Sequence, residues 1–104
     1  MDDTMFECIE DEEIEDVADI DEPPLYKVIL LNDDYTTMEF VVNVLKEVFH
    51  KTLPEATRIM FLVHHTGSGL CGTYPKEIAE TKIEQVHSLA RGAGFPLKAI
   101  MEKE

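Results

Sequence analysis

The sequence predicts an α+β fold in which a small antiparallel three-stranded sheet is covered on one face by three helices. Short β-branched or alternating apolar segments occur at 26–31, 70–74 and 97–102. Between them lie segments whose apolar residues recur every three or four positions. The order strand-helix-helix-strand-helix-strand predicts helices packed on one face of a sheet. The 104 residues have room for one such domain.

The chain divides into an acidic amino-terminal segment, residues 1–22, and a domain, residues 23–104. Twelve of the 22 acidic residues and none of the nine basic ones lie in the segment, so the segment carries −12 of the net charge of −13. Isolated apolar residues among acids predict a disordered tail. Whether it only keeps the protein soluble or engages a partner stays open. Pro23 and Pro24 end it, since paired prolines disfavour helix.

The charge distribution argues against nucleic-acid and membrane partners. The domain has no Lys/Arg stripe to gather phosphates, and the acidic segment repels them. The apolar stretches are shorter than the ~18 residues of a membrane span, and an acidic amino terminus is unlike a signal peptide. Cys8 and Cys71 form neither a disulfide framework nor a paired metal motif. We therefore expect a cytoplasmic protein without metal or cofactor.

The first strand and the first helix are joined by a polar turn. Asn32, Asp33 and Asp34 are turn formers that close the strand, and Thr36 with Glu39 predicts a capping box for the helix. The helix runs from Met38 to about His50. Its apolar face is Met38, Val41, Val42, Leu45, Val48 and Phe49.

The second helix follows a second predicted capping box. Thr52 and Glu55 form the box, Pro54 lies in the first turn, and Gly67 and Gly69 stop the helix. Its inner face is Ala56, Ile59, Met60 and Val63.

Pro75 opens the third helix, and Gly92 and Gly94 terminate it. Its inner face is Ala79, Ile83, Val86 and Ala90. After Pro96, apolar and polar residues alternate, which predicts a half-buried closing strand. The inward residues of that strand are Leu97, Ala99 and Met101.

The turn between the first strand and helix is also the first candidate site. Asn32, Asp33, Asp34, Tyr35 and Thr36 place an amide, two carboxylates and hydroxyls directly after a strand. Such acceptors suit an ammonium group or a metal ion. A plain turn with a helix cap explains the same residues, so both interpretations stay open at this point. The acids do not follow the alternating pattern of a calcium loop.

His64 is the second candidate, because it follows the apolar stripe of the second helix and lies at that helix's end. An ordinary surface or core histidine is the alternative. Cys71 lies within an apolar strand without an orienting partner, which argues against a thiol nucleophile. No hydrolase triad or three-ligand metal set can be assembled, so we expect a binding protein and not an enzyme.

Residues 25–41, LYKVILLNDDYTTMEFV, resemble the signature of the ClpS family, adaptors of the Clp proteases. The resemblance covers about residues 23–104, which makes it more specific than any single motif. Further matches in the family's order and spacing are Ala56, Thr57, Met60, Val63, His64, Gly67, Cys71, Gly72, residues 79–82, Pro96 and Leu97.

The resemblance implies recognition of N-degrons, which are proteins whose first residue is Leu, Phe, Tyr or Trp. It implies that Asn32, His64 and one or both of Asp33 and Asp34 hold the free α-amino group. Residue chemistry agrees, because an ammonium beside an apolar side chain needs acceptors beside an apolar pocket. The pocket it implies is Thr36, Met38, Val41, Met60, Val63 and Leu97. In this pattern Met38 excludes β-branched first residues.

The resemblance also implies a docking surface for an unfoldase, the amino-terminal domain of ClpA or ClpC. Glu77 and Lys82 match family positions for that contact, although an ordinary solvated helix face is the alternative. A role of the acidic segment in handing over substrate follows by analogy alone. The runner-up function is a ClpS-like or ribosomal-stalk-like protein-interaction module without N-degron delivery. A ClpS-like domain of a ubiquitin ligase is disfavoured, because cysteine-rich modules are absent.

Overall fold

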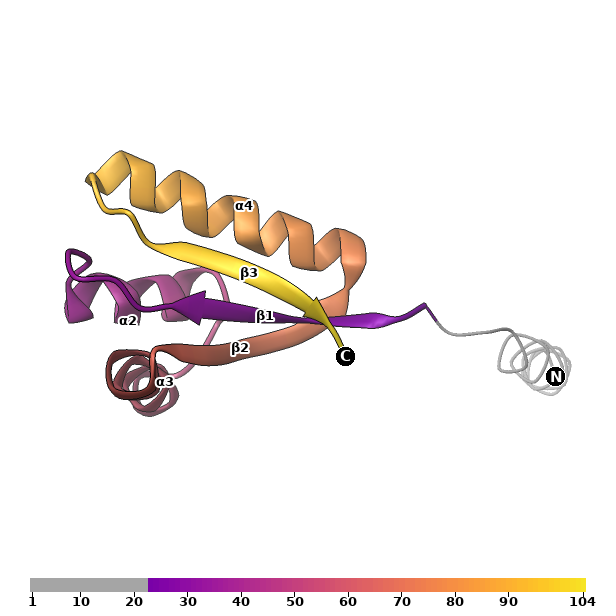
Figure 1. The fold of residues 1–104 in the computed structure, drawn as a ribbon, viewed down its shortest axis with the longest axis horizontal. Helices are drawn as coiled ribbons and strands as arrows, with labels where there is room; N and C mark the ends of the chain where they lie inside the picture. Colours follow the sequence, from indigo (N-terminus) through magenta and orange to yellow (C-terminus); the bar gives the residue numbers. More distant parts are fainter. Residues whose placement is uncertain (1–22) are drawn as a thin grey trace, which may run out of the picture.

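The computed structural model describes residues 23–104, so the predicted disorder of residues 1–22 lies outside the described residues. Strands and helices follow in the predicted order (Figure 1). They are β1 (Leu25–Leu31), α2 (Met38–Glu47), α3 (Leu53–Thr66), β2 (Ser68–Pro75), α4 (Lys76–Ala93) and β3 (Lys98–Lys103). The predicted fold class is thereby confirmed.

The three strands form an antiparallel sheet in the order β2-β1-β3. Because successive side chains of a strand point to opposite faces, Val28 and Leu30 of β1 face the helices and are fully buried. Helix α4 packs on all three strands, α3 packs on β2, and α2 packs on α3. The core therefore lies on one side of the sheet.

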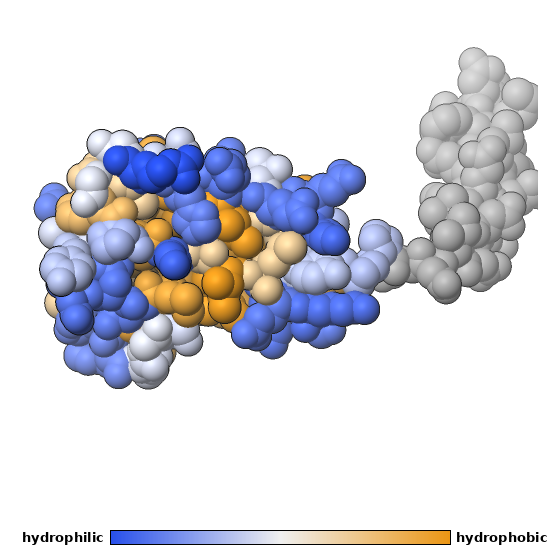
Figure 2. Space-filling model, turned by 45° about the horizontal axis from the view of Figure 1, so that its top comes forward, coloured by the Kyte–Doolittle hydropathy of each residue, from blue (hydrophilic) through white to orange (hydrophobic). Residues whose placement is uncertain are grey.

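The other face of the sheet is open. Ile29 pairs in register with Leu70 on one side and Ile100 on the other. Leu70 is 49% exposed and Ile100 is 38% exposed. Figure 2 shows a face of the domain on which apolar surface lies between hydrophilic borders.

Helix α2 begins at Met38 as predicted, but its capping residue differs from the sequence prediction. Thr37, and not Thr36, is the N-cap residue, and its side chain accepts a hydrogen bond from the Phe40 amide. The hydroxyl of Thr36 donates instead to Asp33. The predicted capping box of Thr36 with Glu39 is therefore wrong, because the Thr36 side chain is hydrogen-bonded to Asp33 and not to the first turn of the helix.

The ends of α3 follow the sequence prediction. Thr52 and Glu55 form a reciprocal capping box, and Gly67 ends the helix in the left-handed conformation with φ of 97°. Glycine adopts this conformation without the steric cost that a Cβ atom adds. Gly69 lies beyond the helix, in β2. The turn at Gly67 sends the chain back along β1 and fixes where α3 ends.

Helix α4 begins after Pro75 and continues through Gly92 to Gly94, where φ is 81°. Its buried residues are Ala79, Val86 and Ala90, as predicted, and Ile83 packs against the core while only partly buried. On β3, Ala99 is buried and Met101 half-buried, which agrees with the predicted alternation.

Candidate functional site

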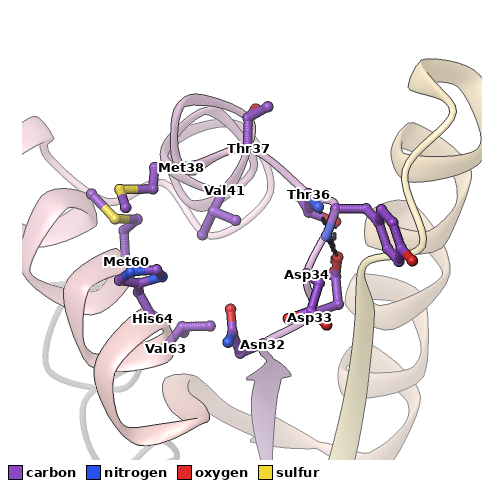
Figure 3. A pocket seen from close by; sticks show the side chains of 11 residues that line it. Asn32, Asp33, Asp34, Thr36, Thr37, Met38, Val41, Met60, Val63 and His64 are labelled. Atoms are coloured by element: carbon purple, nitrogen blue, oxygen red, sulfur yellow. Dashed lines mark hydrogen bonds between the residues drawn. The ribbon is translucent and has the colours of Figure 1, made fainter.

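One cavity of about 410 Å³ brings most of the predicted site residues together. It lies where the loop after β1, the first turns of α2 and the last turns of α3 meet (Figure 3). Its lining residues are Asn32, Asp33, Asp34, Tyr35, Thr36, Thr37, Met38, Val41, Met60, Val63 and His64. Segments separated by about thirty positions in the sequence thus form one site.

The backbone of Asn32 ties the acidic loop to the end of α3. Its amide donates a hydrogen bond of 3.0 Å to the carbonyl oxygen of Gly67. His64 lies on the last turn of α3, just before Gly67. The left-handed turn at Gly67 and this hydrogen bond together set the His64 side chain opposite the loop.

Asp33 is the organising residue of the loop. One carboxylate oxygen accepts from the amides of Tyr35 and Thr36, each at 2.7 Å, and the other accepts from the Thr36 hydroxyl at 2.7 Å. Burial alone would raise the pKa of Asp33, but the hydrogen bonds from Thr36 and Tyr35 hold this pKa below its ordinary value. The carboxylate is therefore ionised at neutral pH and points in one fixed direction.

A carboxylate has about four acceptor positions, so the three bonds within the loop leave Asp33 capacity for a ligand. Figure 3 shows Asn32 between His64 and the two aspartates, with its amide group directed into the cavity. Asn32, Asp34 and His64 are exposed to solvent. Hydrogen-bonding groups from the loop and from α3 therefore converge on one small volume that a donor group can enter.

The opposite part of the cavity is apolar. Val41, Met60 and Val63 are 6%, 7% and 3% exposed, so they belong to the core and form a fixed wall. Met38 is 43% exposed, and Figure 3 shows its side chain beside Met60, away from Asp33. A polar half and an apolar half thus share one cavity, with methionine, a flexible type of side chain, at the apolar edge.

Leu97 is the predicted pocket residue that does not line this cavity. It is 3% exposed and lines a second cavity beneath the end of α4. Thr37 lines the site although the sequence reasoning did not assign it there, and Tyr35, which was counted within the polar turn but not among the ligand-binding residues, lines it as well. Their position in the polar turn or directly after it was the signal available.

The two residues predicted to contact the unfoldase differ in their surroundings. Glu77 is exposed in the first turn of α4. Lys82 is half-buried, and its Nζ donates a 2.7 Å hydrogen bond to the carbonyl oxygen of Val48, the residue that caps α2. The same Nζ lies 5.7 Å from the centre of the Tyr74 ring. Lys82 therefore joins α4 to the end of α2, a role that the sequence analysis missed.

Other chemistries find no support in residues 23–104. Cys71 is 1% exposed, and burial raises the pKa of its thiol to about 12, despite a backbone hydrogen bond from Leu30 and the charge of Lys51. A thiolate nucleophile is thereby excluded at neutral pH. Within this range no three His, Cys, Asp or Glu side chains are grouped as a metal site requires. None of the helices in this part of the chain is long and apolar enough to cross a membrane.

Several known proteins with similar sequences carry the name of an adaptor. The adapter protein ClpS of Desulfatibacillum aliphaticivorans is 63% identical over 82 residues, which cover 79% of each chain. That of Nautilia profundicola is 54% identical over 90 residues, covering 86% of this chain and 93% of the relative.

Solved structures and family models agree with these relatives. The structure of Agrobacterium tumefaciens ClpS2 bound to L-phenylalaninamide superposes with a TM-score of 0.78 at 46% identity, covering 80% of this chain and all of that one. The family model described as ATP-dependent Clp protease adaptor protein ClpS matches residues 21–100. The family model covers most of the chain, the relatives are ClpS adaptors, and the solved ClpS2 structure has the same fold. The chain therefore belongs to the ClpS family of Clp protease adaptors.

Proposed function

We propose that this adaptor binds the free α-amino group and the large hydrophobic first residue of N-degron substrates, namely Leu, Phe, Tyr or Trp, and delivers them to the Clp protease. The observation that carries the proposal is the cavity with a fixed carboxylate on one side and a buried apolar wall on the other. An amino-terminal residue presents the complementary pair, an ammonium and a side chain, on one carbon atom.

The α-ammonium has three donors, and the polar half of the cavity supplies acceptors from Asn32, Asp33 or Asp34, and His64. The first side chain fits against Val41, Met60 and Val63. Burying an aromatic or leucine side chain contributes about 1.5–3 kcal/mol. Phenylalaninamide, to which the relative from A. tumefaciens is bound, carries both a free α-amino group and a phenyl ring. It therefore has the two features that this cavity is suited to receive.

In this proposal Met38 excludes β-branched first residues. It lies at the apolar edge of the cavity and is partly exposed, next to the buried Met60. A branch at Cβ places an extra carbon close to the substrate backbone, at the edge of the cavity where Met38 lies. A side chain without this branch passes Met38 and reaches the apolar wall. Selectivity for Leu over Ile then follows from shape and not from hydrophobicity.

Substrate recognition is tested with peptides that differ only at their first residue, by fluorescence anisotropy. Peptides that begin with Leu or Phe are expected to bind. Acetylation removes the charge and leaves acceptors unpaired at about 1–3 kcal/mol each, so binding should fall at least about tenfold. A peptide that begins with Met should also bind far more weakly. Equal binding of all these peptides would indicate an interaction module without N-degron recognition.

Delivery requires a second surface, which we assign to the exposed first turn of α4 around Glu77, with the amino-terminal domain of ClpA or ClpC as partner. Lys82 contributes to this surface mainly by holding α4 to the end of α2. We place the protein in the cytoplasm, where Clp proteases and their substrates meet.

A further inference from the structure

The cavity proposed for the first residue continues beyond the acidic loop. A hollow of about 210 Å³ shares Asn32 and Asp33 with it and is also lined by Leu31, Pro96 and Lys98. A third cavity of about 280 Å³ shares Pro96 and Lys98 with this hollow and reaches Arg91. The three spaces follow one another through these shared lining residues, from the acidic loop, past the start of β3, to the end of α4, and together we call them the groove.

The far end of the groove, which we call the basic cavity, is lined by His87, Arg91, Phe95 and Lys98 among others. Phe95 packs on Phe40 with the ring centres 4.9 Å apart, so this wall is fixed to α2. His87 accepts a 3.1 Å hydrogen bond at Nε2 from the amide of Ala99. Its own proton is therefore on Nδ1, which makes the neutral ring a donor.

Charge changes sign along the groove. Asp33 and Asp34 line the first cavity, Lys98 lines the hollow together with Asp33 and also lines the basic cavity, and Arg91 lies at the far end. The negative group that faces Arg91 is Glu84, at 3.6 Å, with both side chains about 70% exposed. An exposed pair of this kind is weak and exchanges readily with a ligand. The groove is thus complementary to a peptide with an ammonium at its end and a carboxylate further along.

We propose that the basic cavity is a second subsite, which receives an acidic side chain of the substrate downstream of its first residue and pairs it with Lys98 and Arg91. This inference rests on the proposed N-degron function, because the amino group fixes where the substrate chain starts. Asn32 and Asp33 line both the first cavity and the adjoining hollow. An extended substrate advances about 3.3 Å per residue, so a substrate chain that leaves the first cavity past Asn32 and Asp33 brings its next residues to the hollow and the basic cavity.

The test uses Phe-initiated peptides in which one Glu, or one Gln as its neutral match, occupies each of about seven following positions in turn, which an extended chain covers in roughly 23 Å. Dissociation constants are measured by anisotropy at low ionic strength. At one or two adjacent positions, Glu should bind about two- to fivefold more tightly than Gln, as expected for exposed ion pairs. The variants Lys98→Gln and Arg91→Gln should remove this gain. Lys76→Gln, the same charge change at the other end of α4, should keep it.

Two results would overturn the second subsite. A Glu that makes no difference at any position contradicts it, and so does a gain that survives both Lys98→Gln and Arg91→Gln. The acetylated Phe peptide separates this failure from that of the proposed function. If free and acetylated peptides bind alike, N-degron recognition fails and the subsite fails with it. If only the Glu effect is missing, recognition of the first residue stands and the second subsite alone is refuted.

Discussion

At the level of single residues, the two neighbouring aspartates of the loop have different roles. Asp33 accepts hydrogen bonds from Tyr35 and Thr36 and stays ionised well below neutral pH. Its charge contributes to loop order above the ordinary carboxyl pKa, and this contribution is lost only as the pH falls through the lowered pKa. Asp34 is exposed and lines the same cavity. Asp33 therefore determines the shape of the site, and Asp34 adds charge to it.

Replacing these two residues should weaken peptide binding unequally. Asp33→Ala removes a charged acceptor and frees the loop, so binding of a Phe-initiated peptide should fall about tenfold to a hundredfold, since hydrogen bonds to charged groups contribute about 1.5–3 kcal/mol. Asp34→Ala should cost less than about fivefold, as for an exposed charge. The measurement is anisotropy at neutral pH, with circular dichroism to confirm folding. A larger loss for Asp34→Ala would assign the direct contact to that residue.

At the level of elements, the junction of α3 and β2 connects stability with the site. Gly69 lies where a Cβ atom would come within 2.8 Å of the Cγ2 atom of Val63. Val63 is buried and lines the apolar half of the cavity. The absence of a side chain at Gly69 therefore allows β2 to pass close to α3 and leaves Val63 in place.

Gly69→Ala should both destabilise the domain and weaken peptide binding. The added methyl group overpacks the core, at a cost of about 1–3 kcal/mol, and pushes Val63 toward the cavity. Gly92→Ala is the matched control, because nothing lies within 4 Å of the added Cβ on α4. It should raise stability by about 0.5–1 kcal/mol, since alanine favours helix. Thermal unfolding and anisotropy measure both effects. Normal binding by Gly69→Ala would show that Val63 does not shape the pocket.

At the scale of the whole molecule, the two proposed surfaces lie at opposite ends of the domain. Figure 1 shows the loop between β1 and α2 at one end and the beginning of α4 at the other. The sheet and α4 span the distance between them. A substrate bound at the loop therefore leaves Glu77 free for a second protein, as an adaptor requires.

Glu77→Lys should abolish delivery of an N-degron substrate to the protease while peptide binding stays unchanged, because the charge lies far from the cavity. Degradation of a fluorescent Phe-initiated reporter by the reconstituted protease gives the readout. Lys82→Glu is a less specific variant, since it also breaks the hydrogen bond to Val48 and should lower the melting temperature. Undiminished degradation with Glu77→Lys would move the docking surface elsewhere.

Much of the fold could be predicted because its signals are local. Apolar spacing predicted the strands and helices, and the Thr52–Glu55 box and Gly67 marked the ends of α3. The N-cap residue of α2 was mispredicted for an equally local reason. Thr36 and Thr37 are both suited to cap a helix. The conformation of the loop decides that Thr36 donates a hydrogen bond to Asp33, which leaves Thr37 as the cap.

Periodicity and capping act between residues a few positions apart. The element order, the buried faces and the polar turn could therefore be predicted from the amino-acid sequence. Tertiary structure decided which of these residues meet. The bond from Lys82 to Val48 spans 34 positions, Leu97 lies in the wall of a neighbouring cavity, and the groove joins β1, β3 and α4. Such contacts depend on how helices pack on the sheet, and no pattern along the chain encodes the distances involved.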